Sequence, residues 1–598
     1  AWLAHSNAFV AEIPGHPGWY RYHALFRELL RAELAYESPS QRAHLHRKAA
    51  SWLARHGLLA AAVGRAAAVE AWNEASGFVV DDLAIGEFLL GHDPEGLTQT
   101  LSQMPGDVSD PAASVVRAAL ALAGHDTVRC REELNRALPS ATTAASERDR
   151  AVRLAAHVVE SVLACFIEAP QAAKEIASAA DRDLEAQDRS RLLAHPELTA
   201  LVQFSRGIAL LRNGEVGEAM DALAAGASAA EAPGNQSLLS DCLGYLALIA
   251  AFQGRLQKAR NWASRSIALA ENAGVPAAER SPAGQIALAW VSTEQYNLHA
   301  GREHLEAASR STTLQGDPVS LVMSGLVQSR LHRARGDTNR AIAAIEQAKA
   351  DASRDTSWLV DRLKIEAAAL EIEHGEPEAA VRVVQGLDNP NDAMSSLVLA
   401  QARVAQGNWI AVENVLADIL GRGTGAPLQT LIGGRLLSVA HELNRGKLSR
   451  ARVALDRSLR LAATENLRRP FREAPAVVRK LLESDTELAD RNRWLSSIAP
   501  HQRRTIPGPR SLSTTRIPST PKGSASPSVE QIIEPLTARE LEVLDRLSQL
   551  LTTEEVASAL FVSVNTVRTH VRNILRKLAV SRRNEAVRRA RGLGLIAS

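Results

Sequence analysis

The spacing of apolar and small residues predicts paired helices through the middle of the chain. From about residue 200 to 465, a long helix, a short break and a second helix rich in small residues follow one another, and most breaks lie roughly forty residues apart. The breaks fall near Gly214, Gly254, Tyr296, Gly336, Gly375, Gly407 and Gly446. An alanine recurs five residues after most of them, at Ala219, Ala259, Ala341, Ala380 and Ala451. A small residue there would let the second helix approach the first closely.

Helical pairs at this period resemble tetratricopeptide repeats, which stack into a solenoid. The alternative is a plain helical bundle. A solenoid offers a concave surface to a ligand or a partner segment. The rarest large side chains in this region belong to Trp262, Trp290, Tyr296 and Trp409, and core packing is the favoured role for each of them.

Two helical stretches precede the repeats. Within residues 1–80, the run from Gly18 to Leu30 predicts a strand or turn that leads into an amphipathic helix, and a second helix is expected to end at Gly57. Residues 81–200 are alanine-rich and predicted to be helical.

Residues 500–530 change character, because Pro, Ser and Thr dominate and apolar residues are scarce. Such a composition cannot bury enough surface to fold. We predict a flexible basic linker that tethers the following domain and adds weak phosphate contacts.

The last part of the chain carries the signatures of several short helices. Thr537 with Glu540, and Thr552 with Glu555, have the spacing of capping boxes. Ser563 is placed to cap a further helix. The short gap before Ser563 then becomes the turn of a helix-turn-helix.

The helix predicted after Ser563 separates its residues by face. Its apolar residues recur at intervals of three and four, at Val567, Val571, Ile574, Leu575 and Leu578, and its polar residues lie opposite, at Asn565, Arg568, Thr569, Arg572 and Arg576. Between Val564 and Arg591 there are nine Arg or Lys residues and one acid, Glu585. A solvated face or a membrane-surface helix could carry this charge. The position after a capped turn instead favours insertion into the DNA major groove.

This stretch resembles the LuxR-type DNA-binding domain, a four-helix module. The matching residues are Leu536, Thr537, Arg539, Glu540, Glu542, Val543, Leu544, Glu555, Val556, Ala557, Ser563, Thr566, Val567, Arg568, His570, Asn573, Ile574, Lys577, Leu578, Arg583, Ala586, Val587, Leu593, Gly594 and Leu595. The chain departs from the family in having Leu550 and Ala579 where glycine is usual, and Glu554 where a basic residue is common. A residue other than glycine at a left-handed helix end costs roughly 1 kcal/mol.

The resemblance implies roles for individual residues. Arg568, Thr569 and Arg572 would face base edges, and Thr566, His570 and Lys577 would contact or orient towards phosphates; Arg suits guanine, and Lys suits a phosphate. His570 has core packing within the helix as its alternative. The full predicted DNA-binding set is Ser563, Asn565, Thr566, Arg568, Thr569, His570, Arg572, Arg576 and Lys577. The last helix resembles a dimerisation helix with an apolar stripe of Ala586, Val587 and Ala590.

The N-terminal runs resemble the junction that follows the ATPase core in large LuxR-type regulators of the maltose-regulator kind. Those signal-transduction ATPases combine a nucleotide-binding core, a winged helix, a helical-repeat sensor and the LuxR-type module. The chain contains no Gly-x-x-x-x-Gly-Lys-Ser/Thr motif, which a phosphate-binding loop needs. The resemblance therefore covers only the part after that core, and we assign no ATP site.

Composition adds three limits. The net charge of +2 is unremarkable overall, so the basic character is local to the C-terminus. Cys130, Cys165 and Cys242 lie far apart without metal-ligand spacing, which suits a reducing cytoplasm. No signal peptide and no apolar run long enough to span a membrane are found.

We therefore expect an all-α protein: the end of a winged helix with junction helices (1–80), a helical region (81–200), tetratricopeptide-like repeats (201–499), a disordered basic linker (500–530) and a LuxR-type helix-turn-helix domain (531–598). The expected function is cytoplasmic, sequence-specific transcription regulation in a bacterium, with activation favoured by the resemblance. Expected partners are double-stranded DNA bound as a dimer, a small-molecule or protein inducer at the repeats, and RNA polymerase. No catalytic residue, cofactor, metal or membrane contact is predicted. The alternatives are an interaction scaffold that binds DNA weakly, and the sensor and output half of an ATP-switched regulator.

Overall fold

Helices make up nearly all of the regular structure in the residues that can be described. The computed structural model forms two compact units, Ala1–His501 (unit 1) and Gln502–Ser598 (unit 2). It describes residues 9–12, 20–91, 96–141, 146–232, 234–352, 357–387, 389–390, 392–421, 425–495, 540, 542–544, 556, 564–577, 586 and 590. The predicted linker at 500–530 and the capping residues Thr537, Thr552 and Ser563 lie outside these residues.

Unit 1 begins with a small two-stranded ribbon. Strand β1 (Val10–Glu12) pairs antiparallel with β2 (Tyr20–Tyr22), with Val10 opposite Tyr22. Helix α2 (Ala24–Glu37) follows directly, and α3 (Pro39–Arg55) ends just before Gly57, whose φ is +71°. The predicted strand leading into a helix, and the helix end at Gly57, are both confirmed.

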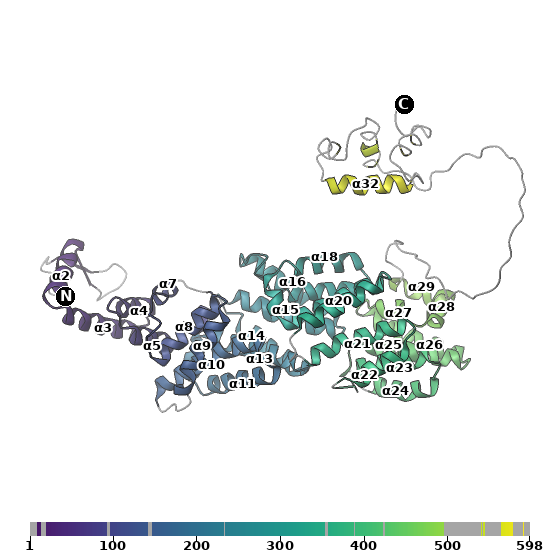
Figure 1. Ribbon diagram of the computed structural model, residues 1–598, viewed down its shortest axis with the longest axis horizontal. Helices are drawn as coiled ribbons and strands as arrows, with labels where there is room; N and C mark the ends of the chain where they lie inside the picture. Colours follow the sequence, from purple (N-terminus) through teal and green to yellow (C-terminus); the bar gives the residue numbers. More distant parts are fainter. Residues whose placement is uncertain are drawn as a thin grey trace, which may run out of the picture. The chain divides into compact units, whose positions relative to one another are not determined.

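Further helices lead into the repeats (Figure 1). They are α4 (Leu59–Ala67), α5 (Trp72–Asp81), α6 (Ile85–Leu89), α7 (Leu97–Leu101), α8 (Pro111–Ala123), α9 (Thr127–Ala141), α10 (Glu147–Ile167), α11 (Pro170–Glu185) and α12 (Arg189–Ala194). Local chemistry sets their starts. Ser146 and Asp149 form a reciprocal capping box at α10, and the Asp110 carboxylate accepts a hydrogen bond from the Ala113 amide at α8.

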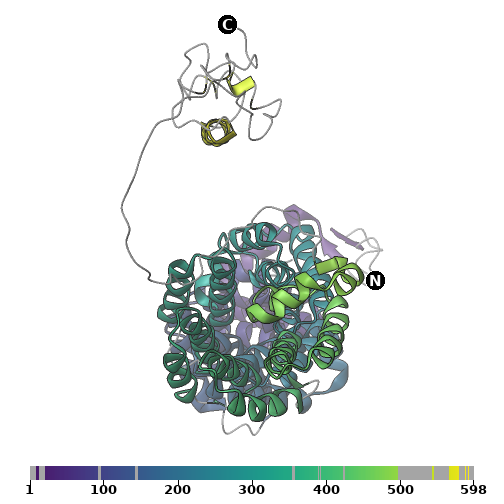
Figure 2. The same cartoon turned by 90° about the vertical axis from the view of Figure 1, so that its right-hand side faces the viewer.

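The repeat region is a succession of antiparallel helical pairs. The pairs are α13 (Pro196–Arg212) with α14 (Val216–Ala229), α15 (Gln236–Phe252) with α16 (Leu256–Asn272), α17 (Ala283–Glu294) with α18 (Leu298–Ala308), α19 (Pro318–Ala334) with α20 (Thr338–Asp351), α21 (Ser357–Glu373) with α22 (Pro377–Gln385), α23 (Ala393–Ala405) with α24 (Trp409–Gly421), and α25 (Leu428–Asn444) with α26 (Leu448–Ala463). A short 3-10 helix, η1 (Thr312–Gly316), precedes α19. Seen along the axis of unit 1, the helices follow one another around a ring (Figure 2), as a solenoid requires.

Every predicted break between paired helices is confirmed by the backbone. Each break residue has a positive φ, between +61° at Tyr296 and +87° at Gly375. This left-handed conformation ends the first helix and costs glycine little. Tyr296 is the exception in side chain, and its hydroxyl donates to the Ala334 carbonyl oxygen at 3.3 Å.

Small residues bring the paired helices together as predicted. The five recurring alanines, at Ala219, Ala259, Ala341, Ala380 and Ala451, are all fully buried. Glycines supply further close contacts. A Cβ added at Gly325 in α19 would lie 2.4 Å from Ala348 Cβ in α20, and one at Gly207 in α13 would lie 2.5 Å from Leu223 Cγ in α14.

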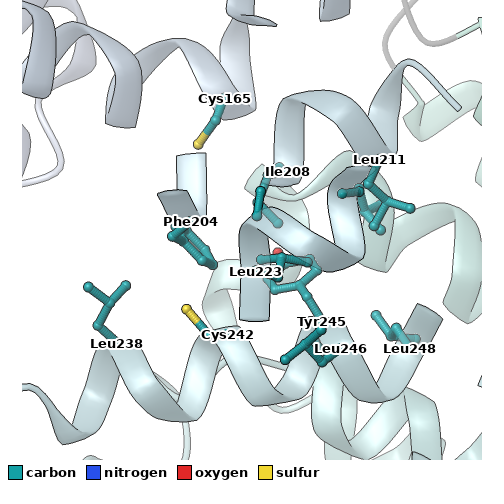
Figure 3. Packing of buried hydrophobic residues seen from close by; sticks show 14 of the residues in the cluster. Cys165, Phe204, Ile208, Leu211, Leu223, Leu238, Cys242, Tyr245, Leu246 and Leu248 are labelled. Carbon is teal, nitrogen blue, oxygen red and sulfur yellow. The ribbon is translucent and has the colours of Figure 1, made fainter. Parts of the chain in front are cut away.

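Aromatic and aliphatic side chains fill the space between successive pairs. Around α13, α14 and α15 the ring of Phe204 meets the ring of Tyr245 edge-on at 5.7 Å, beside the free, buried Cys165 and Cys242 (Figure 3). Trp290 is fully buried and lies 6.1 Å from the ring of Phe252, so its predicted core role is confirmed.

Unit 1 closes with short helices that contact much earlier repeats. These are α27 (Arg469–Arg472), α28 (Ala476–Ser484), α29 (Thr486–Arg491) and the 3-10 helix η3 (Arg493–Leu495). The amide of Arg468 donates to the carbonyl oxygen of Glu294 at 3.0 Å, across more than 170 residues of sequence. Among the residues described, no helix has both the length and the apolarity that crossing a membrane requires.

Candidate nucleic-acid interface

In unit 2 the structure describes one long helix, α32 (Val564–Lys577), where the recognition helix was predicted. Val567 and Ile574 are fully buried, whereas Arg572 is exposed. Val567 and Ile574 thus face inward as predicted, and Arg572 is the member of the predicted polar face whose side chain is described. An exposed guanidinium beside a packed apolar face is available to a groove or a phosphate.

The predicted DNA-binding residues lie in different settings. His570 is half-buried, between the packed and the exposed sides of α32, so both of its predicted roles stay open. Asn565, Thr566, Arg568, Thr569 and Arg576 lie within α32, but their side chains are outside the described part of the structure. Ser563, together with Leu550, Glu554 and Ala579 where the chain departs from the LuxR-type pattern, also lies outside it.

Lys577, at the end of α32, is held by an ion pair inside the module. Its Nζ lies 2.7 Å from Oε2 of Glu540, and the two side chains are 11% and 4% exposed. A buried carboxylate is tolerated when a cation compensates its charge. The pair therefore joins the first described residue of unit 2 to the last residue of α32. From the sequence, Glu540 was predicted to belong to a capping box and Lys577 to lie near a phosphate. The signal for their pairing was that both belong to the LuxR-type pattern and carry opposite charges.

The predicted dimerisation stripe is largely packed within the chain itself. Ala586 and Ala590 are buried in a structure that contains a single copy. Val587 lies outside the described residues. Val543, Leu544 and Val556 are likewise fully buried.

Comparison with known proteins accounts for most of the chain. The luxR family of bacterial regulatory proteins matches residues 534–590. The MalT-like TPR region matches residues 159–488, which is more than half of the chain. The MalT winged helix domain matches residues 1–42.

Several curated proteins are similar to the chain. The HTH-type transcriptional regulator MalT of Klebsiella pneumoniae (strain 342) is 24% identical over 634 residues, covering 99% of this chain and 66% of that protein. MalT of Yersinia pestis (strain Pestoides F) is 23% identical with the same coverage. The uncharacterized transcriptional regulatory protein YxjL of Bacillus subtilis (strain 168) is 48% identical over 58 residues, covering 10% of this chain and 27% of that protein.

The chain thus spans 66% of the length of the MalT relatives that it matches. Among solved structures, it is similar to a Rap protein complexed with Competence and Sporulation Factor, with a TM-score of 0.44 and 11% identity over 59% of this chain and 98% of that one. The family matches agree with the observed helical pairs of unit 1 and with α32 in unit 2. The chain belongs to the MalT-like family of LuxR-type, DNA-binding transcriptional regulators.

Proposed function

We propose that the chain is a sequence-specific transcriptional activator in which the helical repeats of unit 1 sense a signal and control DNA binding by unit 2. The observation that carries the proposal is helix α32, which buries its apolar face and exposes Arg572 within the stretch that matches the luxR family. The relatives that are named MalT transcriptional regulators support the regulatory role. Activation rests on the resemblance to the maltose-regulator kind alone.

Base reading is assigned to the N-terminal half and the exposed face of α32, through Arg568, Thr569 and Arg572. Ser563, Asn565, Thr566, His570 and Arg576 contact phosphates or orient the helix on them. Lys577 acts differently, because its ammonium group is already paired with Glu540. We assign it to holding α32 in place.

The remaining partners follow from the same scheme. Two copies bind two half-sites of one duplex, an inducer, either a small molecule or a protein, acts at the helical repeats, and RNA polymerase is the downstream partner. The protein works in the cytoplasm. No catalytic step or cofactor is part of this function.

Selection of duplexes from a random pool by the full chain, followed by a salt titration on the enriched sequence, tests the proposal. We expect a motif with dyad symmetry and an affinity that falls steeply with salt, because Arg and Lys side chains displace counterions from phosphates. Salt-sensitive binding without any enriched motif would overturn the proposal and favour an interaction scaffold.

A further inference from the structure

A cluster of buried charges joins the end of unit 1 to the middle of the solenoid. Its acids and bases come from α17, α19, α21 and α27, and from the residue after α27. The charge cluster consists of Glu294, Arg330, Arg333, Glu366, Glu373, Arg469 and Glu473. Glu294 is fully buried, and Arg330 and Glu366 are nearly so.

Arg469 of α27 is the link between the distant parts of the chain. Its Nη2 lies 2.9 Å from Glu294 Oε1, and its Nη1 lies 2.8 Å from Glu473 Oε2. Arg330 continues the network, with Nε 2.9 Å from Glu366 Oε2 and Nη1 3.3 Å from Glu294 Oε1. Arg333 contacts Glu366, Glu373 and Glu473.

Glu366 stays ionised although it is buried. Burial by itself would raise the pKa of Glu366, but the guanidinium groups of Arg330, Arg333 and Arg469 outweigh it and lower that pKa to about 2. The cluster holds four carboxylates and three guanidinium groups, and each guanidinium is shared by two or more carboxylates. Removing one charged partner leaves the opposite charge uncompensated in the protein interior, which solvates charge poorly. The ion pairs of the cluster are therefore expected to form or break together.

The contact around the cluster combines apolar packing, in which Phe471 and Val478 are buried, with polar contacts. Besides the Arg468 amide, the Gln295 side-chain amide donates to the Glu465 carbonyl oxygen at 3.1 Å, and the Gln429 side-chain amide donates to the Phe252 carbonyl oxygen at 2.7 Å. Replacing buried ion pairs by apolar side chains often leaves a protein as stable or makes it more stable. The ion pairs therefore add interdependence to the contact, whereas its apolar side chains supply the burial.

A cavity of about 90 Å³ lies directly against the cluster and is lined by Arg330, Arg333, Glu366, Arg469 and Glu473 among others. Two carboxylate oxygens of the cluster, Glu294 Oε2 and Glu473 Oε1, are buried and have no hydrogen-bond partner among the residues described. The hydrogen bonding of the cluster is thus incomplete, and Glu473 is also one of the residues that line the cavity. A small polar molecule that entered the cavity would compete for the same charged groups.

We propose that the charge cluster is a latch that holds α27, α28 and α29 against the inner repeats, and that its opening frees the segment leading into unit 2. The latch itself does not depend on DNA binding. Its regulatory meaning rests on the proposed function, because that segment is the chain's connection to the DNA-binding module.

Hydrogen exchange measured by mass spectrometry on the full chain tests the latch. In Arg469→Gln we expect amides of residues 464–495 to exchange at least a hundredfold faster, because the variant leaves Glu294 and Glu473 without their shared cation. Amides of α13 to α16 should be unchanged. Arg153→Gln is the matched control, since Arg153 is a partly buried arginine paired with Asp183 elsewhere in unit 1; it should leave residues 464–495 protected.

Unchanged exchange at residues 464–495 would overturn the latch, and so would an equal loss of protection throughout unit 1, which would indicate a purely structural cluster. The double variant Glu294→Gln with Arg469→Gln keeps the test decisive if the single variant folds poorly. It removes both charges of one ion pair. We therefore expect amides of residues 464–495 to exchange about tenfold or more slower in the double variant than in Arg469→Gln. No recovery would count against the latch.

A second readout separates the latch from its regulatory role. On the duplex selected by the wild-type chain, Arg469→Gln should change the dissociation constant at least threefold, and Arg153→Gln should not. An open latch with unchanged DNA affinity would overturn the regulatory role. If the wild-type chain selects no DNA motif, the proposed function fails, whereas the exchange data still decide whether the latch exists.

Discussion

At the residue scale, Lys577 is proposed to hold α32 in place rather than to contact DNA. Its ion pair with Glu540 is almost completely buried. We expect Lys577→Met to lower the stability of unit 2 by roughly 2–4 kcal/mol, because the buried carboxylate loses that cation. Thermal unfolding of the full chain measures this loss, with Arg572→Met on the exposed face of α32 as the control. A phosphate role predicts the opposite pattern, namely normal stability and a salt slope reduced by about 0.9.

Arg572 is the described residue best placed to read a base. We expect Arg572→Ala, and likewise Arg568→Ala, to cost about 1–3 kcal/mol on the selected duplex and to relax the preference at one base position. The binding of a panel of single-base variants by the full chain measures this. Arg450→Ala, which removes an exposed arginine from unit 1, controls for net charge. Retention of the wild-type preference by both variants in α32 would show that base reading lies elsewhere.

Asp241 of α15 makes the stability of unit 1 depend on pH. Burial, and then the negative charge of Asp317, raise the pKa of Asp241 from 3.8 to about 7. The folded state therefore holds a proton that the unfolded state releases, and this contribution to stability is lost as pH rises through about 7. We expect the melting temperature of unit 1 to fall between pH 5 and 8, and Asp241→Asn to reduce that fall. The exposed Asp221→Asn is the control, and identical pH profiles for all three proteins would contradict the assignment.

At the scale of elements, the closeness of paired helices depends on missing side chains. Alanine in place of a glycine inside a helix normally adds up to about 1 kcal/mol of stability. Gly325→Ala should instead destabilise unit 1 by about 1–3 kcal/mol, because its Cβ would lie 2.4 Å from Ala348 Cβ on the facing helix. Chemical denaturation measures the difference. Gly64→Ala, at a helical position with open space around it, should stabilise the protein. A stabilised Gly325→Ala would mean that the two helices separate easily.

Features that depend on neighbouring residues could be predicted from the sequence, whereas contacts between distant residues could not. A break between paired helices can be predicted from neighbouring residues. Gly336 and Gly446 indicate a left-handed conformation, and the alanine five residues later indicates a close contact between the helices. His125 also has a positive φ, +61°, between α8 and α9, but nothing in its side chain signals it. Contacts across long separations are not local. Neither Arg469 with Glu294 nor Lys577 with Glu540 could be paired from the sequence, because any of many opposite charges would fit equally well.

In the candidate nucleic-acid interface, too, local patterns could be predicted and contacts between distant residues could not. The apolar face of α32 was predicted from periodicity; Val567 and Ile574 are buried and Arg572 is exposed, as that prediction requires of these three residues. The burial of Ala586 and Ala590 within a single copy was not predicted, because small apolar residues fit a module's own core as well as a partner. Periodicity shows that a residue faces inward, but not which surface covers it.

At the scale of the whole molecule, the proposed binding of two modules to one operator would depend on unit 2 and on the predicted linker. If the modules contact each other, their spacing on DNA is set by that contact. We expect insertion of five base pairs between the selected half-sites to reduce the affinity of the full chain to that of a single half-site, because the second site then faces the opposite side of the duplex. Fluorescence anisotropy at fixed salt measures the change.

The matched control for that experiment inserts ten base pairs, which restores the face of the duplex but not the distance. Modules that contact each other should bind this duplex weakly as well. Modules held only by a flexible linker should bind both spaced duplexes almost as tightly as the original, since such a linker adjusts its reach at little cost. Tight binding to both duplexes would therefore overturn the dimeric module. It would fit the burial of Ala586 and Ala590 within a single copy, and the link between the two modules would then have to lie in unit 1.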